Sequence, residues 1–216
     1  MKPCLKLSSL SLLLVVLLGA CGNPYKKLLQ QPTTSSALRF QPEYDKVLYR
    51  GIVDGKMIWK RFHLSGILMF KKMEDSSIRV VLQNEMGVSF FDFEWDKQQQ
   101  FTVKQIIPQL DKKAVVALLQ KDLQLLLMIG LQSQTESTFS KDEETYQRFT
   151  LDKGYVYYIS TNNQLTRIEN AGKQKVTTIS LGGKNGLKEL PERVVFKHHK
   201  ANFTIQLKRI DDHVEE

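Results

Sequence analysis

The sequence predicts a mostly β domain of the α+β class, an antiparallel meander of about twelve strands with one amphipathic helix near its middle. Short runs rich in β-branched and aromatic residues recur along most of the chain, separated by turn-forming residues, which is typical of antiparallel strands. A single stretch after Pro108 has the 3.6-residue apolar period of a helix. With 216 residues, 42% of them apolar, the chain can form one domain with a sizeable core.

The first twenty residues have the composition of a signal peptide, so we expect residues 1–20 to be absent from the mature protein. Lys2 and Lys6 precede an apolar run from Leu10 to Leu18 that is too short for a bilayer span, which needs about 20 residues. The following Leu-Gly-Ala-Cys sequence, which ends at Cys21, resembles the lipobox of bacterial lipoproteins. This resemblance implies a diacylglyceryl thioether on Cys21 and anchoring to a membrane surface through lipid. An ordinary secretory signal that ends beside a cysteine is the alternative.

Residues 21–43 are predicted to form a lipidated N-terminus and a flexible tether, because Pro, Gln, Ser and Thr dominate them without a sustained period. The globular domain is predicted to span residues 44–216. Cys4 would leave with the signal peptide, so the mature chain would hold Cys21 alone and no intrachain disulfide. No acidic residue occurs between Cys21 and Lys27, which favours an outer-membrane location facing the periplasm over inner-membrane retention or surface export.

The first half of the domain is predicted to be a meander of six strands, with breaks at Asp54-Gly55, at residues 74–76, at residues 85–87 and at residues 96–99. The expected strands are Lys46 to Val53, Met57 to His63, Ser65 to Lys72, Ser77 to Asn84, Val88 to Trp95 and Phe101 to Ile107.

The helix is predicted to begin after Asp111, whose side chain can cap it, and to end near Gly130. Its polar residues lie mostly opposite its apolar ones. The apolar positions are Val115, Leu118, Leu119, Leu123, Leu126 and Leu127. This stripe is predicted to pack on the sheet, and a membrane-binding face is the alternative.

A polar loop from Gln132 to Glu144 is expected to follow the helix, and the chain then returns to strands. The expected strands are Thr145 to Thr150, Tyr155 to Ser160, Gln164 to Glu169, Lys175 to Leu181, Arg193 to His199 and Phe203 to Ile210.

The C-terminal strands resemble the closing hairpin of the LolA/LolB-like periplasmic lipoprotein carriers. In that hairpin a proline precedes two alternating strands, as Pro191 does here before Arg193 to Phe196 and Phe203 to Lys208. The strand after Gly154 and its Asn162-Asn163 turn also resemble this family. The resemblance implies a large unclosed antiparallel half-barrel, with the helix packed on its concave side around an apolar cavity. Two departures are the single helix, where those carriers have several, and the lack of an identifiable exposed apolar loop for membrane insertion. Uncharacterised Bacteroidetes lipoproteins are similar as well.

The charge balance points to an acidic partner or an anionic surface. Without residues 1–20 the chain has 29 basic and 23 acidic residues, a net charge of +6. Nucleic acid is not an expected partner outside the cytoplasm. No catalytic residue, metal site or cofactor is predicted, because no nucleophile elbow, metalloprotease motif or phosphate loop occurs. His198 and His199 are adjacent in a strand, so they point to opposite faces, and alternate Asp92 and Glu94 are expected on a solvated outer face.

Period-two alternation names candidate residues for the lining of an apolar cavity, although ordinary packed core is the favoured interpretation at any single position. These residues are Phe62, Leu64, Leu68, Phe70, Ile78, Val80, Leu82, Phe91, Phe93, Trp95, Tyr155, Tyr157, Phe203, Ile205 and Leu207.

Three functions fit the sequence. The first is an outer-membrane-anchored lipoprotein that binds a lipid, or the acyl chains of another lipoprotein, in the half-barrel. The second is a non-catalytic scaffold or accessory subunit of a cell-envelope complex, with the half-barrel filled by its own side chains and a surface for an envelope protein partner. The third is a hydrolase of an envelope polymer, for which the sequence supplies no matching set of acids.

Overall fold

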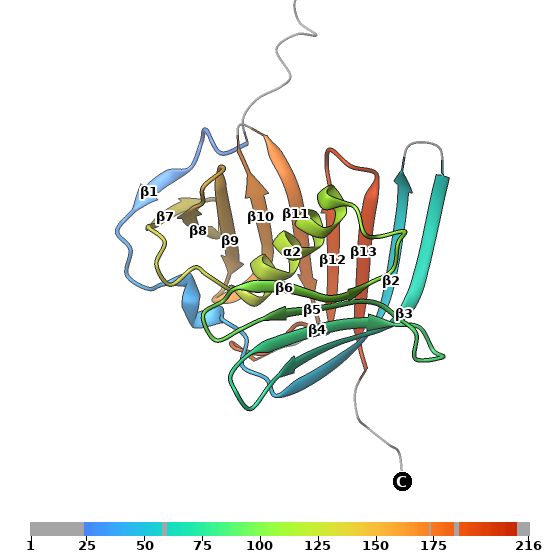
Figure 1. Ribbon diagram of the computed structural model, residues 1–216. Coiled ribbons are helices and arrows are strands. Elements are labelled where there is room, and N and C mark those ends of the chain that lie inside the picture. Colours follow the sequence, from blue (N-terminus) through green and yellow to red (C-terminus); the bar gives the residue numbers. More distant parts are fainter. Residues whose placement is uncertain (1–23, 58–59, 173, 184–185, 211–216) are drawn as a thin grey trace, which may run out of the picture.

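The fold is a 13-stranded antiparallel sheet that curls into an open half-barrel around one α-helix (Figure 1). The computed structural model describes residues 24–57, 60–172, 174–183 and 186–210. The predicted signal peptide and Cys21 therefore lie outside the described residues. The strand order is β1-β7-β8-β9-β10-β11-β12-β13-β2-β3-β4-β5-β6, so the two halves of the chain join where β13 pairs with β2. The predicted fold class is confirmed.

The first half contains five strands, one fewer than predicted. Their bounds are β2 Lys46–Met57, β3 Lys60–Lys72, β4 Ile78–Gln83, β5 Ser89–Trp95 and β6 Phe101–Ile106. The predicted break at Asp54-Gly55 is wrong, because β2 continues through it and pairs with β3 in unbroken register. The predicted strand Ser65 to Lys72 and the residues from Lys60 to His63 of the preceding predicted strand are parts of β3, whereas Met57 is the last residue of β2.

Two glycines inside these long strands allow close packing, and one of them, Gly55, explains why the sequence suggested a turn inside β2. A Cβ atom on Gly66 would lie 2.0 Å from the backbone oxygen of Gln83, so only glycine permits this approach of β3 to the β4 side. A Cβ atom on Gly55 would lie 2.3 Å from Cζ of Phe62. The residues serve close packing in the strands and not reversal of the chain.

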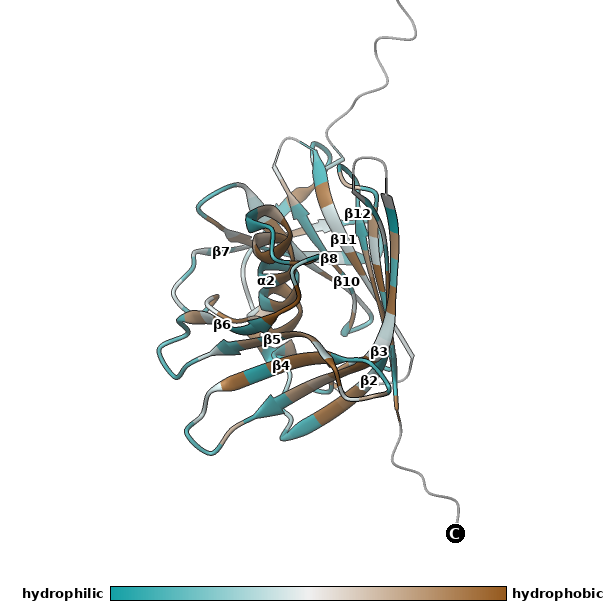
Figure 2. Cartoon of the chain, turned by 45° about the vertical axis from the view of Figure 1, so that its right-hand side comes forward, coloured by the Kyte–Doolittle hydropathy of each residue, from teal (hydrophilic) through white to brown (hydrophobic). Residues whose placement is uncertain are grey.

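Helix α2 spans Lys113–Leu127 and lies across the concave side of the sheet (Figure 2), as predicted. Its N-cap is Lys112, which makes no capping bond through its side chain, so the predicted cap by Asp111 is wrong. The helix ends two residues earlier than the sequence suggested, at a left-handed Met128 whose φ is 55°. In Figure 2, hydrophobic (brown) and hydrophilic (teal) residues alternate along α2 and along the strands.

The second half contains seven strands, one more than predicted, because β7 forms inside the predicted polar loop of Gln132 to Glu144. In β7 the single aromatic residue is Phe139 and the remaining residues are polar, so the sequence shows little apolar alternation. The bounds are β7 Glu136–Lys141, β8 Glu144–Thr150, β9 Tyr155–Thr161, β10 Gln164–Ala171, β11 Lys175–Gly182, β12 Arg193–His198 and β13 Phe203–Arg209.

The N-terminal segment wraps around the free edge of the sheet, which corrects the prediction of a tether for residues 25–43. Tyr25 packs on one face of β9, strand β1 (Leu29–Gln31) pairs with β7, and the 3₁₀ helix η1 (Ala37–Phe40) enters the main core on the other face. Ala37 is 0% and Phe40 4% exposed. The sequence suggested a tether because the segment is held by side-chain contacts and by backbone pairing with β7, and has no apolar period of its own.

Candidate functional site

Most of the predicted cavity residues meet on the concave side of the half-barrel. Ten of them are buried members of the main hydrophobic cluster, in which the apolar residues of α2 also take part. These are Leu68, Phe70, Val80, Leu82, Phe91, Phe93, Trp95, Phe203, Ile205 and Leu207, with Phe62, Leu64 and Ile78 packed against them.

Tyr155 and Tyr157 do not belong to this group. They lie in a second cluster, with Tyr146, on the convex face of the sheet. Their neighbours Val156 and Tyr158 in β9 face the concave side instead. The alternation of β9 did not reveal this because residues Val156 to Ser160 are all buried, the convex face being covered by the N-terminal segment from Tyr25.

A small cavity of about 20 Å³ lies between α2 and the sheet. Its lining is apolar throughout and includes five of the predicted residues, Leu68, Leu82, Phe91, Ile205 and Leu207, together with Leu119 and Leu123 of the helix. This volume is little more than one water molecule occupies. The helix therefore fills the concave side that the sequence predicted as a cavity.

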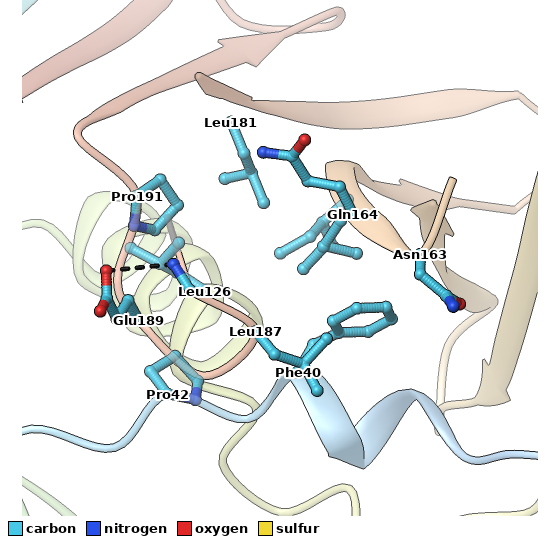
Figure 3. A pocket seen from close by; sticks show the side chains of 12 residues that line it. Phe40, Pro42, Leu126, Asn163, Gln164, Leu181, Leu187, Glu189 and Pro191 are labelled. Atoms are coloured by element: carbon cyan, nitrogen blue, oxygen red, sulfur yellow. Dashed lines mark hydrogen bonds between the residues drawn. The ribbon is translucent and has the colours of Figure 1, made fainter. Parts of the chain in front are cut away.

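A larger pocket of about 300 Å³ opens at the edge of the half-barrel near the C-terminal end of α2 (Figure 3). Leu126, Ile168, Leu181 and Phe40 supply apolar lining, and Asn163, Gln164 and Glu189 supply polar groups. Leu187 also lines it and is 53% exposed. The volume lies at the lower end of the range for ligand pockets.

One face of α2 contributes side chains to both the small cavity and the larger pocket. Leu119 and Leu123 line the small cavity, and Leu126 lines the pocket. These three residues follow the spacing that places side chains on one helix face. An apolar chain that entered at the pocket and replaced this face of the helix would meet a continuous apolar surface of the sheet.

The same helix face carries a buried ion pair to the sheet. Oδ2 of Asp122 lies 2.7 Å from Nε2 of His198 on β12, and the two side chains are 2% and 3% exposed. Nδ1 of His198 lies 2.9 Å from the carbonyl oxygen of Phe203. Since both ring nitrogens face acceptors, the imidazolium form satisfies both contacts.

The pair shifts both protonation equilibria. Burial by itself would lower the pKa of His198, but the hydrogen bond and charge of Asp122 and the carbonyl of Phe203 raise it overall. Burial raises the pKa of Asp122 despite the contact with His198. A second polar bond holds the helix nearby, since the hydroxyl of Tyr158 donates to the carbonyl oxygen of Leu125 over 2.8 Å.

A separate, more polar groove of about 520 Å³ lies between residues 41–45 and strands β4 and β5. Trp95 and Tyr44 line it, and in the described residues neither the Trp95 Nε1 nor the Tyr44 hydroxyl has a hydrogen-bond partner. Burial raises the pKa of Tyr44. Lys72, Lys97 and Lys188 are offset by acids in the same groove, so it has no strong charge preference.

The remaining polar groups fit structural roles. Asp92 forms a two-pronged pair with Arg79, and Glu94 pairs with Lys104 over 3.0 Å. The expectation of a solvated outer face is wrong for Asp92, which is 7% exposed and held by Arg79. Within the described ranges, no group of three or more His, Cys, Asp and Glu residues could hold a metal ion. No helix in the described part of the chain is long and apolar enough to cross a membrane.

Sequence reasoning missed Asp122 and the docked Tyr25. Asp122 occupies a helix position between Leu119 and Leu126, and a carboxyl inside an apolar stripe is a detectable signal for a buried pair. For its partner His198, the sequence predicted only that the side chain lies on the face opposite His199. The structure confirms this prediction, because His198 is buried and His199 is exposed. The ring of His199 contacts Thr178 Oγ1 at 2.9 Å.

Comparison with known proteins adds a structural likeness. No protein-family model and no curated protein matches the sequence. A LolA superfamily protein from Nitrosomonas europaea is similar in structure, with a TM-score of 0.50 and 11% identity over 81% of this chain and 89% of that chain. An outer membrane lipoprotein-sorting protein domain from Vibrio parahaemolyticus gives 0.48 and 7% over 82% and 89%. A DUF1329 family protein from Desulfovibrio piger gives 0.46 and 8% over 83% and 92%.

These identities bear on the fold alone. Together with the unclosed 13-stranded sheet and the helix on its concave side, the first of these likenesses shows that the chain has a LolA/LolB-like fold.

Proposed function

We propose that this protein is an outer-membrane-anchored lipoprotein, facing the periplasm, that binds an apolar ligand on the concave side of its half-barrel. The ligand would be a lipid or the acyl chains of another lipoprotein, and Cys21 would carry the anchor. The protein would act by binding, without catalysis and without a cofactor.

The observation that carries the proposal is the apolar face of α2. It covers the small cavity with Leu119 and Leu123 and reaches the open pocket with Leu126. Acyl chains are held by burial of apolar surface, about 25 cal/mol per Å², and need no directed bonds. An acyl chain that entered past Leu187 would leave water and make the apolar contacts with the sheet that α2 makes in this structure.

A scaffold function is the second candidate, and the small volume of the cavity favours it. A half-barrel that its own helix fills needs no ligand for stability. In that case the protein would bind an envelope protein through its surface. The two functions differ in whether α2 leaves the sheet when acyl chains are supplied.

The test is native mass spectrometry with lipid extraction on the mature chain with Cys21→Ser, which carries no anchor and is purified from a bacterial periplasm. Uptake of a fluorescent fatty acid is measured in parallel. We expect a stoichiometric lipid and saturable uptake, and Leu187→Lys should weaken uptake about tenfold, because a charge at the exposed mouth opposes entry of an apolar chain.

Met86→Lys is the matched control, since Met86 is 83% exposed and lies in the turn between β4 and β5. Its uptake should equal that of the unchanged protein. A folded protein that holds no lipid and takes up neither fatty acid nor acylated peptide would contradict acyl binding and favour the scaffold.

A further inference from the structure

One edge of the half-barrel, beside the docked Tyr25, carries a group of exposed basic residues with few exposed acids. The connections between β8 and β9, β10 and β11, and β12 and β13 share this edge with the far ends of β2 and β3, as the register of the neighbouring strands requires. These connections lie at the top of Figure 1. Its exposed basic residues, which we call the basic rim, are Lys26, Lys27, Lys56, Arg61, Lys153, Lys197 and Lys200.

The exposed acids of the described residues on this edge are few. Asp54 pairs with His63 at 2.7 Å, and Asp152 is close enough to Lys121 to affect the pKa of that lysine. The opposite edge differs, because its connections carry acids interspersed with lysines. The exposed acids there are Glu43, Asp45, Glu74, Asp75, Asp142, Glu143 and Glu189. The molecule therefore has a charge difference between its two edges.

The N-terminal segment is fixed beside the rim. The rings of Tyr25 and Tyr157 stack with centroids 4.1 Å apart and planes 3° from parallel, and the Tyr25 hydroxyl donates to Glu169 over 2.6 Å. Glu169 is 1% exposed and also pairs with Lys175 at 2.6 Å and with Arg167 at 3.1 Å. Tyr157 and Glu169 pair across β9 and β10, two residues from the end of β9 at the rim.

The distance from this point to the anchor is short. Four residues lead from Tyr25 back to Cys21, and a fully extended chain of four residues spans at most about 14 Å. A lipid on Cys21 would hold the domain within this distance of the bilayer. The screening length at physiological ionic strength is about 8 Å, so charges on the nearest edge act on the headgroups and charges on the far edge do not.

We propose that the basic rim lies against the membrane that holds the anchor and binds its anionic headgroups. The part of this proposal that concerns the anchor rests on the proposed function. The rim then faces the bilayer, and the edge with the pocket of Phe40 and Leu187 faces away from it. This orientation would leave the pocket open to ligands and partners in the periplasm.

The first experiment needs no anchor. The mature chain with Cys21→Ser is sedimented with vesicles of phosphatidylcholine alone or with added phosphatidylglycerol, at low ionic strength. We expect binding only with phosphatidylglycerol. Lys153→Gln with Lys200→Gln should weaken it about 25-fold, because each lysine near an anionic surface contributes roughly fivefold. Both residues lie in exposed turns, so the variant should keep its fold, which circular dichroism checks.

The matched control removes the same charge from the opposite edge, with Lys72→Gln and Lys188→Gln, and should change binding less than twofold. Equal losses in the two variants, or binding that ignores phosphatidylglycerol, would overturn the proposal. Mass spectrometry of the natural chain reports the acylation of Cys21 separately, and fatty-acid uptake reports the concave side. Failure of the rim can thus be told from failure of the proposed function.

The second experiment measures how the acylated protein is oriented relative to the membrane. Nitroxide labels are placed at Lys200→Cys on the rim and at Asp142→Cys on the far edge, in vesicles that contain phosphatidylglycerol. The rim label should be protected from a water-soluble relaxation agent several-fold more than the far label. Equal accessibility of the two labels would reject the orientation.

Discussion

At the scale of single residues, the buried pair of Asp122 and His198 is expected to have a large effect on stability. In this pair, Asp122 of α2 contacts His198 of β12 inside an apolar core. Loss of one partner leaves the other buried without compensation, which costs about 3 kcal/mol or more. His198→Ala should therefore lower the free energy of unfolding by about 3 kcal/mol, as measured by chemical denaturation.

The pair also predicts how stability depends on pH. Because the pKa of His198 is raised in the folded protein, its contribution is present below the unfolded value near 6.5 and is lost as pH rises through the folded value. In Asp122→Asn, burial, which is the largest influence, would outweigh the carbonyl of Phe203 and lower the pKa of His198, so the sign of this contribution should reverse. The measurement is the unfolding free energy of both proteins between about pH 6 and pH 9.

The exposed pair of Asp54 and His63 supplies the control for this prediction. Its atoms are also 2.7 Å apart, but its side chains are 52% and 61% exposed. Asp54→Asn should change stability by less than about 1 kcal/mol. A pH profile of Asp122→Asn that matched the unchanged protein would show that the buried pair does not govern the profile.

Residue-level prediction from sequence succeeded where one face of a strand is apolar and the other polar, as for Phe91 and Phe93, which alternate with Asp92 and Glu94. It failed for Tyr155 and Tyr157, because both faces of β9 are covered. Alternation carries information only when one face meets water. The faces of a strand buried on both sides are decided by distant segments, here by α2 and by Tyr25.

At the scale of elements, α2 is the part that must move if the concave side takes a ligand. Leu123→Ala should cost about 2 to 5 kcal/mol and enlarge the cavity next to it. We expect this variant to take up fatty acid faster, because less apolar contact holds the helix on the sheet. Stopped-flow fluorescence measures the rate.

Leu127→Ala is the matched control on the same helix. Leu127 is 2% exposed but lines the polar groove beside Trp95 and not the cavity, so its loss should cost similar stability without a faster uptake. Equal acceleration in both variants would assign the effect to general loosening. The faster uptake would then not be due to the enlarged cavity next to Leu123.

The N-terminal segment is the second element with a testable role. Tyr25→Ala removes the stacking on Tyr157 and the bond to Glu169, and should cost about 1 to 2 kcal/mol locally. Amides of residues 29–31 should then exchange with solvent at least tenfold faster, as hydrogen exchange measures. Tyr25→Phe keeps the ring and should show a smaller effect; equal effects would mean that stacking contributes nothing.

At the scale of the whole molecule, the sequence predicted the class, the helix on the concave side and the half-barrel implied by the resemblance. It did not predict that the chain before Tyr44 belongs to the fold. Strand β1 contains a leucine and two glutamines, and all three are exposed. Its place is decided by the free edge of β7, whose backbone groups need partners. These unpaired backbone groups exist only once the sheet has formed, so no local sequence pattern predicts that β1 pairs with them.

The wrapped segment places the docked Tyr25 and the mouth of the pocket on one continuous piece of chain. It is pinned by Tyr25 on the convex face, pairs with β7 along the sheet edge and ends with Phe40 in the lining of the pocket. A mechanical load applied at the N-terminus must pass through this piece before it reaches the rest of the sheet. Traction from an anchored end would therefore act first on the contacts of Tyr25 with Tyr157 and Glu169, then on β1, and then on the wall that Phe40 provides.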